Sequence, residues 1–304
     1  MRLTDRLLAG RLPPDAVFPA GEAGHVVRMV ALPGGTRVRV IECPPREGDP
    51  AARPALFVHG WGVSSYTFHR NLRPVADAGV PVWGFDLKGH GYSDKPVDAA
   101  EYTLDALARH VLDVMDALGL ERALLVGHSM GGGIAVRVAT TAPERVAGLV
   151  LLAPVGFGAV NLARLAVWLL PKPLDTLLPY LAWRAATRVA LALAYGSRAR
   201  PSARDVDEYW APTADPAFVR AVREVTRAVD WRPGRPEELA RVRCPAVVLF
   251  GTEDRIVRGD SADTYVRCLP EARLELIRGA GHVLPEEVPE RVNEVIVECA
   301  RAWR

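Results

Sequence analysis

The sequence predicts a doubly wound α/β protein, in which a mostly parallel β-sheet is covered by helices on both faces. Strand-like segments alternate with helix-like segments along most of the chain. The strand-like segments are nearly continuous apolar runs, as expected for strands of a parallel sheet that is buried on both sides. With 304 residues, of which 49% are hydrophobic and 24% charged, the chain fits one large domain or a core with an insertion.

The first two strand-like segments, 25–32 and 36–43, are joined by Pro-Gly-Gly and predict an opening hairpin. Six apolar segments follow: 54–60, 80–86, 123–129, 146–154, 245–251 and 272–279. Because parallel strands end at the same edge of a sheet, we expect ligands at the carboxyl ends of these segments.

Helical patterns lie between these segments. Residues 103–118 repeat apolar side chains every three or four positions, with Thr103 as the expected N-cap. Residues 130–141 and 289–303 are further helical candidates. From about 155 to 235 no strand pattern occurs, and Leu/Ala/Arg-rich helical stretches are cut by prolines. We therefore divide the chain into a core of residues 1–154 and 236–304, and a helical insertion of residues 155–235.

Charge and apolar runs exclude several classes of protein. The net charge is +2 and no Lys/Arg-rich block occurs, which argues against a nucleic-acid partner. Asp5, Arg6 and Arg11 interrupt the region that a secretory signal would need to be apolar. The longest apolar stretch, 162–195, is broken by charges and prolines before it reaches the ~18 residues of a transmembrane helix. We expect a soluble, cytoplasmic protein without an integral membrane segment.

The sequence indicates neither a metal nor an organic cofactor. The four cysteines lie far apart without a CxxC motif, so we expect reduced thiols (Cys43, Cys244, Cys268 and Cys299). No His/Cys/carboxylate cluster has metal-ligand spacing, and no phosphate-binding glycine fingerprint is followed by a matching acidic residue.

A serine between glycines is the first candidate for chemistry. Gly127-His128-Ser129-Met130-Gly131 stands between an apolar strand and a helix, which is the setting of the G-x-S-x-G nucleophile elbow. Strand and helix must approach closely in such a turn, and Gly127 and Gly131 permit that approach. The Met130 N–H, at the start of the helix, would face a developing oxyanion. A simple turn serine is the alternative, so a base and an acid must be found elsewhere.

The expected base is His282, because RGAGHVLPEE places it in a Gly-rich loop directly after the last strand. His128 is expected to point away from the serine. The remaining histidines are expected to be structural or exposed: His25, His59, His69, His90 and His110. Glu253 and Asp254 follow the preceding strand, and the G-x-x-D spacing favours Asp254 as the acid. The alternative for Asp254 is a role as a helix cap.

The loop FVHGWG, residues 57–62, can complete the site. It follows the third strand and can present the Trp61 N–H beside that of Met130 as an oxyanion hole. His59 is expected to brace this loop.

Together these motifs resemble those of the α/β-hydrolase superfamily, in its cap-bearing branch of esterases, lipases, epoxide hydrolases, dehalogenases and C–C bond hydrolases. The matching stretches are HGWG (59–62), FDLKGHGYSDKP (85–96), GHSMGG (127–132), GTEDRIV (251–257) and GAGHVLPEEVPE (279–290). The resemblance implies the α/β-hydrolase fold, with an eight-stranded, mostly parallel sheet. It also implies a cap, or lid, inserted after the sixth strand, where residues 155–235 fall.

Serine at the elbow favours a hydrolase that cleaves carboxylic esters of small apolar substrates through an acyl-enzyme, because dehalogenases and the related epoxide hydrolases use aspartate there. A meta-cleavage-type C–C bond hydrolase, a lactonase or a perhydrolase stays open on the same triad, although Val283 stands where C–C hydrolases commonly have tryptophan. A non-catalytic sensor of a small ligand is the alternative from another class. In the cap, Trp168 and Trp183 are candidate substrate-binding residues, and Arg184 and Arg188 are candidate carboxylate-binding residues.

Overall fold

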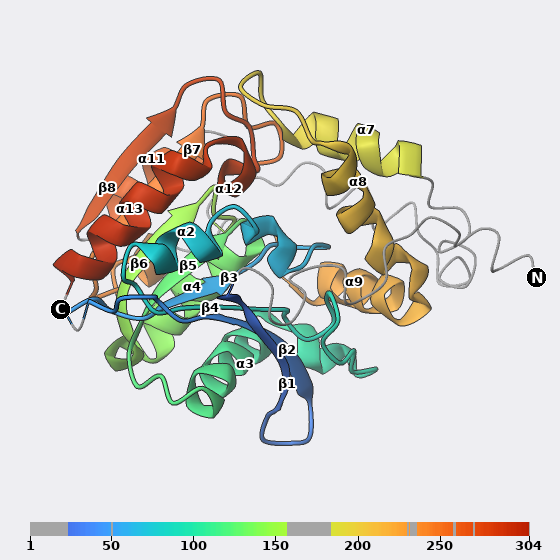
Figure 1. The fold of residues 1–304 in the computed structure, drawn as a ribbon, viewed down its shortest axis with the longest axis horizontal. Helices are drawn as coiled ribbons and strands as arrows, with labels where there is room; N and C mark the ends of the chain where they lie inside the picture. Colours follow the sequence, from blue (N-terminus) through green and yellow to red (C-terminus); the bar gives the residue numbers. More distant parts are fainter. Residues whose placement is uncertain are drawn as a thin grey trace, which may run out of the picture.

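An eight-stranded sheet forms the centre of the protein (Figure 1). The computed structural model describes residues 24–49, 51–156, 184–229, 231, 236–257, 260–269 and 271–303. The strands are β1 (Val26–Ala31), β2 (Arg37–Cys43), β3 (Ala55–Val58), β4 (Val82–Phe85), β5 (Ala123–His128), β6 (Val146–Leu152), β7 (Ala246–Gly251) and β8 (Ala272–Ile277). Their order is β1-β2-β4-β3-β5-β6-β7-β8. Only the β1–β2 and β2–β4 pairings are antiparallel, which confirms the predicted mostly parallel sheet and its opening hairpin.

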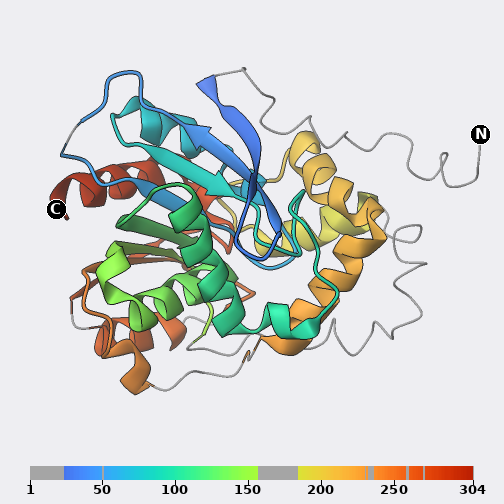
Figure 2. The same ribbon diagram turned by 90° about the horizontal axis from the view of Figure 1, so that it is seen from below.

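Helices cover both faces of the sheet (Figure 2). One face carries α2 (Leu72–Asp77) and α13 (Pro289–Ala302), which contact each other, while α3 (Leu104–Ala117), α4 (Met130–Thr141) and α11 (Asp260–Cys268) lie on the other. The shorter helices are η2 (Ser65–Phe68), η3 (Ala99–Tyr102), η4 (Pro143–Arg145), η6 (Ala211–Ala214), α10 (Pro236–Leu239) and α12 (Leu284–Glu287). The three predicted helices are present, and the Thr103 hydroxyl accepts the Ala106 N–H at 3.2 Å as the cap of α3.

Burial explains why the central strands read as unbroken apolar runs. Every residue of β3, β5, β6 and β7 is buried, because helices cover both faces of these strands. The edge strands β1 and β8 keep most residues partly or fully exposed. The loops that follow the carboxyl ends of these buried strands therefore start from a rigid, packed core.

The regular elements described between β6 and β7 are helices. Besides α10, they are α7 (Arg184–Ala194), α8 (Ala203–Trp210), η6 and α9 (Pro216–Ala228), and these four lie together beside one end of the sheet (Figure 1). Trp168 and Trp183 lie outside the described residues, so their predicted contact with substrate is not described. Among the residues that the structure describes, no helix is both long and apolar enough to span a membrane.

Packing of the chain terminus against β6 gives a direct test of the fold. A methyl group added at Gly148 would lie 1.9 Å from Cε3 of Trp303, so Gly148→Ala must displace the indole. Such overpacking costs about 1–3 kcal/mol, and we expect the Tm to fall by a few degrees. Gly48→Ala is the matched control, because its nearest new neighbour, a Pro45 atom, is 3.6 Å away. Equal melting temperatures for the two variants would contradict this packing.

Candidate active site

Ser129 occupies a strained turn between β5 and α4. Its φ of 54° and ψ of −120° lie in a region that residues with side chains rarely adopt. The turn is held by its own backbone: the Ser129 N–H donates to the Leu152 carbonyl at 2.9 Å, and the Ser129 carbonyl accepts the N–H groups of Gly132 at 2.9 Å and Val155 at 3.1 Å. The fold thus supports a serine conformation that an isolated turn would not keep.

Close packing around this turn requires glycine at both flanking positions. A Cβ on Gly127 would lie 2.6 Å from the carbonyl oxygen of Gly131. A Cβ on Gly131 would lie 2.0 Å from the carbonyl oxygen of Val58, at the end of β3. Either substitution would push α4 away from the sheet, and with it the start of the helix that follows Ser129.

Two later strand ends bring an imidazole and a carboxylate to Ser129. The Ser129 hydroxyl lies 2.9 Å from Nε2 of His282, in the loop after β8. Nδ1 of the same imidazole lies 2.8 Å from Oδ2 of Asp254, in the loop after β7. All three side chains are largely buried. The arrangement is a continuous hydrogen-bond chain in which Asp254 accepts from Nδ1–H and leaves Nε2 free to accept the serine proton.

Asp254 is held as a carboxylate aimed at His282. Burial alone would raise the pKa of Asp254, but His282 and the N–H groups of Ile256 and Val257 hold it below its ordinary value. Those two N–H groups bond to Oδ1 at 2.8 and 3.0 Å, so one oxygen organises the loop while the other meets the imidazole. The neighbouring Glu253 instead accepts the N–H and hydroxyl of Ser197, at 2.8 and 2.7 Å.

His128 does not bond to the serine beside it. Its Nε2–H donates to the backbone carbonyl of His282 at 2.9 Å, and burial lowers the pKa of His128 to about 3. His59 is likewise neutral, because burial lowers its pKa. The His59 ring joins Gly60 to Leu87: Nδ1–H donates to the Gly60 carbonyl at 2.8 Å and Nε2 accepts the Leu87 N–H at 2.9 Å.

The loop after β3 lies directly against the serine. A Cβ on Gly60 would approach Cβ of Ser129 to 3.1 Å. The Trp61 indole N–H donates to the Thr226 hydroxyl at 2.8 Å, which ties this loop to α9. Within the described part of the chain, no backbone hydrogen bond is made by the N–H of Trp61 or of Met130.

Glu287 accepts hydrogen bonds from the backbone of the His282 loop, and the sequence analysis did not predict this role. Its buried carboxyl accepts the N–H groups on both sides of His282, from Gly281 at 2.9 Å and Val283 at 3.1 Å. It also accepts the Gly196 N–H at 2.8 Å. The His282 N–H itself donates to the Ala194 carbonyl at 2.7 Å. A glutamate pair four and five residues after the candidate catalytic histidine, next to apolar residues, was the signal available in the sequence.

The adjacent Glu286 is also buried, and it contacts the hydroxyls of Tyr195 and Tyr209. Burial raises its pKa to about 8, although both tyrosine hydrogen bonds lower it. Asp205 adds to the upward shift of the Glu286 pKa, and Arg70 opposes it.

A cavity of about 280 Å³ opens in front of Ser129 and His282. Its described lining is mainly apolar and comes from the loop after β3, from α7 and from the loops that carry the triad residues: Gly60, Trp61, Gly62, Val63, Thr67, His128, Val155, Thr187, Ala190, Leu191, Ala194, Tyr209, Trp231, Ile256 and Val283. Arg184 and Arg188 are not part of it. Arg184 pairs with Asp207, and Arg188 is exposed.

No group of three or more His, Cys, Asp or Glu side chains in the described ranges could hold a metal ion. The polar side chains in the described lining of the cavity include those of Ser129, His282, Thr67, Thr187 and Tyr209.

The fold and this site define an α/β protein with a serine, histidine and aspartate at three strand ends. The chain belongs to the alpha/beta hydrolase fold family, whose model matches residues 54–289.

The sequence of this chain is similar to those of proteins with known and with unknown activity. An uncharacterized protein of Mycobacterium tuberculosis is 30% identical over 79% of this chain and 73% of its own length. A 2-hydroxy-6-oxononadienedioate/2-hydroxy-6-oxononatrienedioate hydrolase of Paraburkholderia phymatum is 30% identical over 91% of this chain and 96% of its own. Among solved structures, carboxylesterase CesB of Bacillus subtilis superposes with a TM-score of 0.70 at 20% identity, covering 97% and 96% of the two chains. That last likeness is one of fold.

The hydrogen bonds that Glu287 accepts around His282 lead us to expect that Glu287→Gln slows the reaction of Ser129 with diisopropyl fluorophosphate. The amide would present an N–H group where three backbone N–H groups now find acceptors, so the imidazole would shift. We expect the rate to fall about tenfold to a hundredfold, since a small misplacement costs this much. Glu290→Gln, at an exposed glutamate on the next helix, is the control. An unchanged rate in Glu287→Gln would show that the loop keeps its position without the carboxylate.

The raised pKa of Glu286 leads us to predict that the stability of the protein depends on pH. Its carboxyl ionises near pH 4.5 in the unfolded chain and at about 8 in the folded protein. Between these values the folded state holds the extra proton, so this group makes the protein less stable as pH rises. Glu286→Gln should lose less free energy of unfolding than the wild type across this interval, as measured by urea denaturation. Parallel profiles for both proteins would contradict the shift.

Proposed function

We propose that the protein is a serine hydrolase that cleaves carboxylic esters of small apolar molecules through an acyl-enzyme on Ser129. The observation that carries this proposal is the hydrogen-bond chain from the Ser129 hydroxyl through His282 to Asp254, with distances of 2.9 and 2.8 Å. The Ser129 end of these hydrogen bonds faces a largely apolar cavity, where an acyl group or an alcohol can bind.

In the first half of the proposed reaction, Ser129 Oγ attacks the ester carbonyl while His282 Nε2 takes its proton. Asp254 stabilises the imidazolium that forms and keeps Nδ1 protonated. The tetrahedral oxyanion lies between the N–H groups of Met130 and Trp61, each worth about 10²–10³ in rate for donors of this kind. When the intermediate collapses, His282 returns the proton to the departing alcohol, and the acyl group stays on Ser129.

In the second half, a water molecule takes the place of the alcohol. His282 removes its proton as it attacks the acyl carbon, and the same two N–H groups stabilise the second oxyanion. Collapse releases the carboxylic acid and returns the proton to Ser129. Because every proton passes through the His282 imidazole, the position of this ring affects the rates of both acylation and deacylation.

Helices of the insertion supply one wall of the cavity, with Leu191 and Ala194 from α7 and Tyr209 from α8. This wall supports our assignment of residues 155–235 as a cap on a core of residues 1–154 and 236–304. The apolar walls favour apolar substituents on the substrate. We place this activity in the cytoplasm.

A C–C bond hydrolase of the meta-cleavage type is the second candidate. The similarity to the Paraburkholderia phymatum hydrolase, along 91% of this chain, favours it. That relative is named for a dioate, which carries two carboxylates. The described lining of the cavity here contains no Lys or Arg to pair with them. Ester cleavage is therefore our first proposal.

A panel of p-nitrophenyl esters of increasing acyl length, with one lactone and one meta-cleavage diketone, tests the proposal. We expect cleavage of the esters, and loss of that activity by several orders of magnitude in His282→Ala. Cleavage of the diketone alone would favour the C–C hydrolase. Absence of turnover on the whole panel, with a ligand still bound, would favour a non-catalytic sensor.

The carboxylate assignment predicts a contrast between two neighbours. Asp254→Asn should lower kcat by about 10⁴-fold, because the amide favours the wrong histidine tautomer. Glu253→Gln should have little effect on kcat, since Glu253 bonds to Ser197 and not to the imidazole. Steady-state kinetics on the best ester checks both variants, and the reverse order of effects would exchange the two roles.

A further inference from the structure

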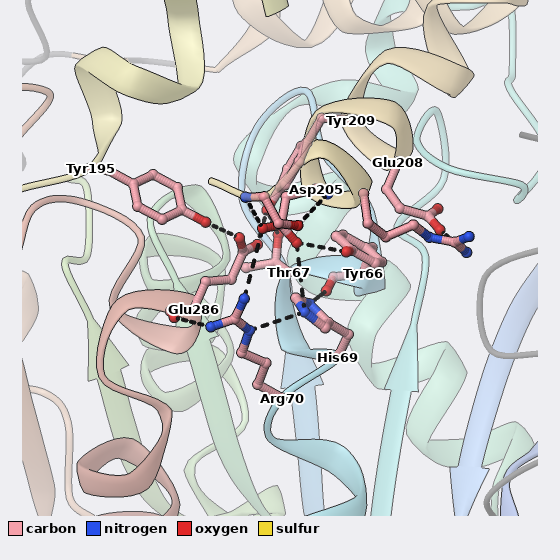
Figure 3. Close-up of polar contacts among 11 residues, drawn as sticks. Tyr66, Thr67, His69, Arg70, Tyr195, Asp205, Glu208, Tyr209 and Glu286 are labelled. Carbon is pink, nitrogen blue, oxygen red and sulfur yellow. Dashed lines mark hydrogen bonds and ion pairs between the residues drawn. The ribbon is translucent and has the colours of Figure 1, made fainter. Parts of the chain in front are cut away.

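Hydrogen bonds join the helices between β6 and β7 to two parts of the active site. On α12, the Glu286 carboxyl contacts the hydroxyls of Tyr195 and Tyr209 (Figure 3). At the loop after β3, the Trp61 indole N–H donates to the Thr226 hydroxyl of α9 at 2.8 Å. The second contact reaches the loop that packs against the candidate nucleophile, and so it can affect the chemistry there.

The peptide that joins Gly60 to Trp61 is fixed from its carbonyl side. Its carbonyl oxygen accepts the Nδ1–H of His59 at 2.8 Å. Since no described peptide bond is cis, the Trp61 N–H points to the opposite edge of the same peptide plane. A Cβ on Gly60 would lie 3.1 Å from Cβ of Ser129, so this peptide lies beside the serine. The direction of the Trp61 N–H therefore depends on the position of one peptide plane.

The indole of Trp61 is the side chain that can anchor the other side of this peptide, because glycine stands on both sides of the tryptophan. Gly62 has a φ of 70°, in the left-handed region that favours glycine. The indole is partly buried, and its N–H, which can only donate, finds its acceptor in the buried hydroxyl of Thr226. A shift of the indole would move the Trp61 backbone, and with it the N–H.

Thr226 is itself held in one orientation. Its hydroxyl donates to the Val222 carbonyl, one turn earlier in α9, at 2.6 Å, which leaves its lone pairs to accept the indole N–H. The backbone carbonyl of Thr226 accepts the indole N–H of Trp231 at 2.8 Å. Both tryptophans line the cavity. One residue of α9 therefore holds two indoles of the cavity wall, one through its side chain and one through its backbone.

We propose that Thr226 is a positioning residue for the oxyanion hole, which acts by holding the Trp61 indole and through it the Trp61 N–H. This inference rests on the proposed ester hydrolysis, in which that N–H stabilises the oxyanion. A donor stabilises an oxyanion best when its position is fixed before the charge develops. The hydrogen bond from the indole to α9 supplies this fixed position, so a helix between β6 and β7 contributes to the rate of the reaction.

Two substitutions of Thr226 test its hydroxyl. Thr226→Val removes the hydroxyl and keeps the shape of the side chain. We expect kcat on the best p-nitrophenyl ester to fall about tenfold and KM to stay within about twofold, because the oxyanion is present in the transition state and not in the bound ester. Thr226→Ser keeps the hydroxyl and should keep kcat near the wild-type value. An unchanged kcat in Thr226→Val, or equal losses in both variants, would overturn the proposal.

Thr213→Val is the matched control on a neighbouring helix. The Thr213 hydroxyl donates to the Trp210 carbonyl at 2.7 Å, in the way that Thr226 donates to Val222. Thr213 lies outside the described lining of the cavity, and no described hydrogen bond joins it to Trp61. We expect Thr213→Val to leave kcat unchanged. If it lowers kcat as much as Thr226→Val does, the effect comes from general damage to these helices and the positioning role is wrong.

A double-mutant cycle shows whether Thr226 acts through Trp61. Trp61→Phe removes the indole N–H, so the hydrogen bond to α9 is already absent in this background. There, Thr226→Val should lower kcat by less than about twofold, since its partner is gone. A further loss as large as that in the wild-type background would mean that Thr226 acts by another route, and it would contradict the proposal.

The reaction with diisopropyl fluorophosphate separates this inference from the proposed function. Ser129 Oγ attacks the phosphorus, fluoride leaves, and the phosphoryl oxygen needs the same donors although no ester is cleaved. A reaction about tenfold slower in Thr226→Val than in Thr213→Val supports the positioning role, even if the wild type cleaves no ester and the proposed function fails. Equal rates in the two variants overturn the positioning role, while ester cleavage by the wild type leaves the proposed function standing.

Discussion

The close approach of α4 to the ends of β3 and β5 is the constraint on which the site depends. At Gly131 a side chain would reach within 2.0 Å of the Val58 carbonyl oxygen, so the backbone of the helix packs directly on that of the strand. Ser129 adopts a positive-φ conformation at this contact, and α4 begins at the next residue. A rigid, fully buried set of strands is needed to support that strain.

The rest of the site is assembled by the parallel arrangement of β5, β7 and β8. Ser129, Asp254 and His282 follow three strands of one sheet, so residues far apart in sequence end at one edge. The described helices between β6 and β7 contact the loop that carries His282. Ala194, at the end of α7, accepts the His282 N–H, and Gly196 donates to Glu287. Glu286 contacts Tyr195 after α7 and Tyr209 on α8. Hydrogen bonds therefore join the His282 loop to the described helices between β6 and β7.

Much of this could be predicted from sequence because it is encoded locally. Apolar runs marked the buried strands, Thr103 marked a helix start, and the glycines beside Ser129 marked a close approach. Because parallel strands end at the same edge of a sheet, the sequence also predicted that His282 and Asp254 lie near Ser129. Glu286, Glu287 and Thr67 were missed, because their partners Gly196, Tyr195 and Tyr209 are remote in sequence and follow no periodic pattern. A Pro-Glu-Glu run reads as an ordinary helix start until its burial is known.

Acid-quenched mass spectrometry tests the central claim most directly, namely that His282 makes Ser129 a nucleophile. The protein is mixed with p-nitrophenyl acetate, quenched within the first turnover and digested. The account predicts one acetyl group on the peptide that contains Ser129, and its absence in Ser129→Ala and His282→Ala. An acetyl group on another residue, or turnover at the wild-type rate in Ser129→Ala, would contradict it.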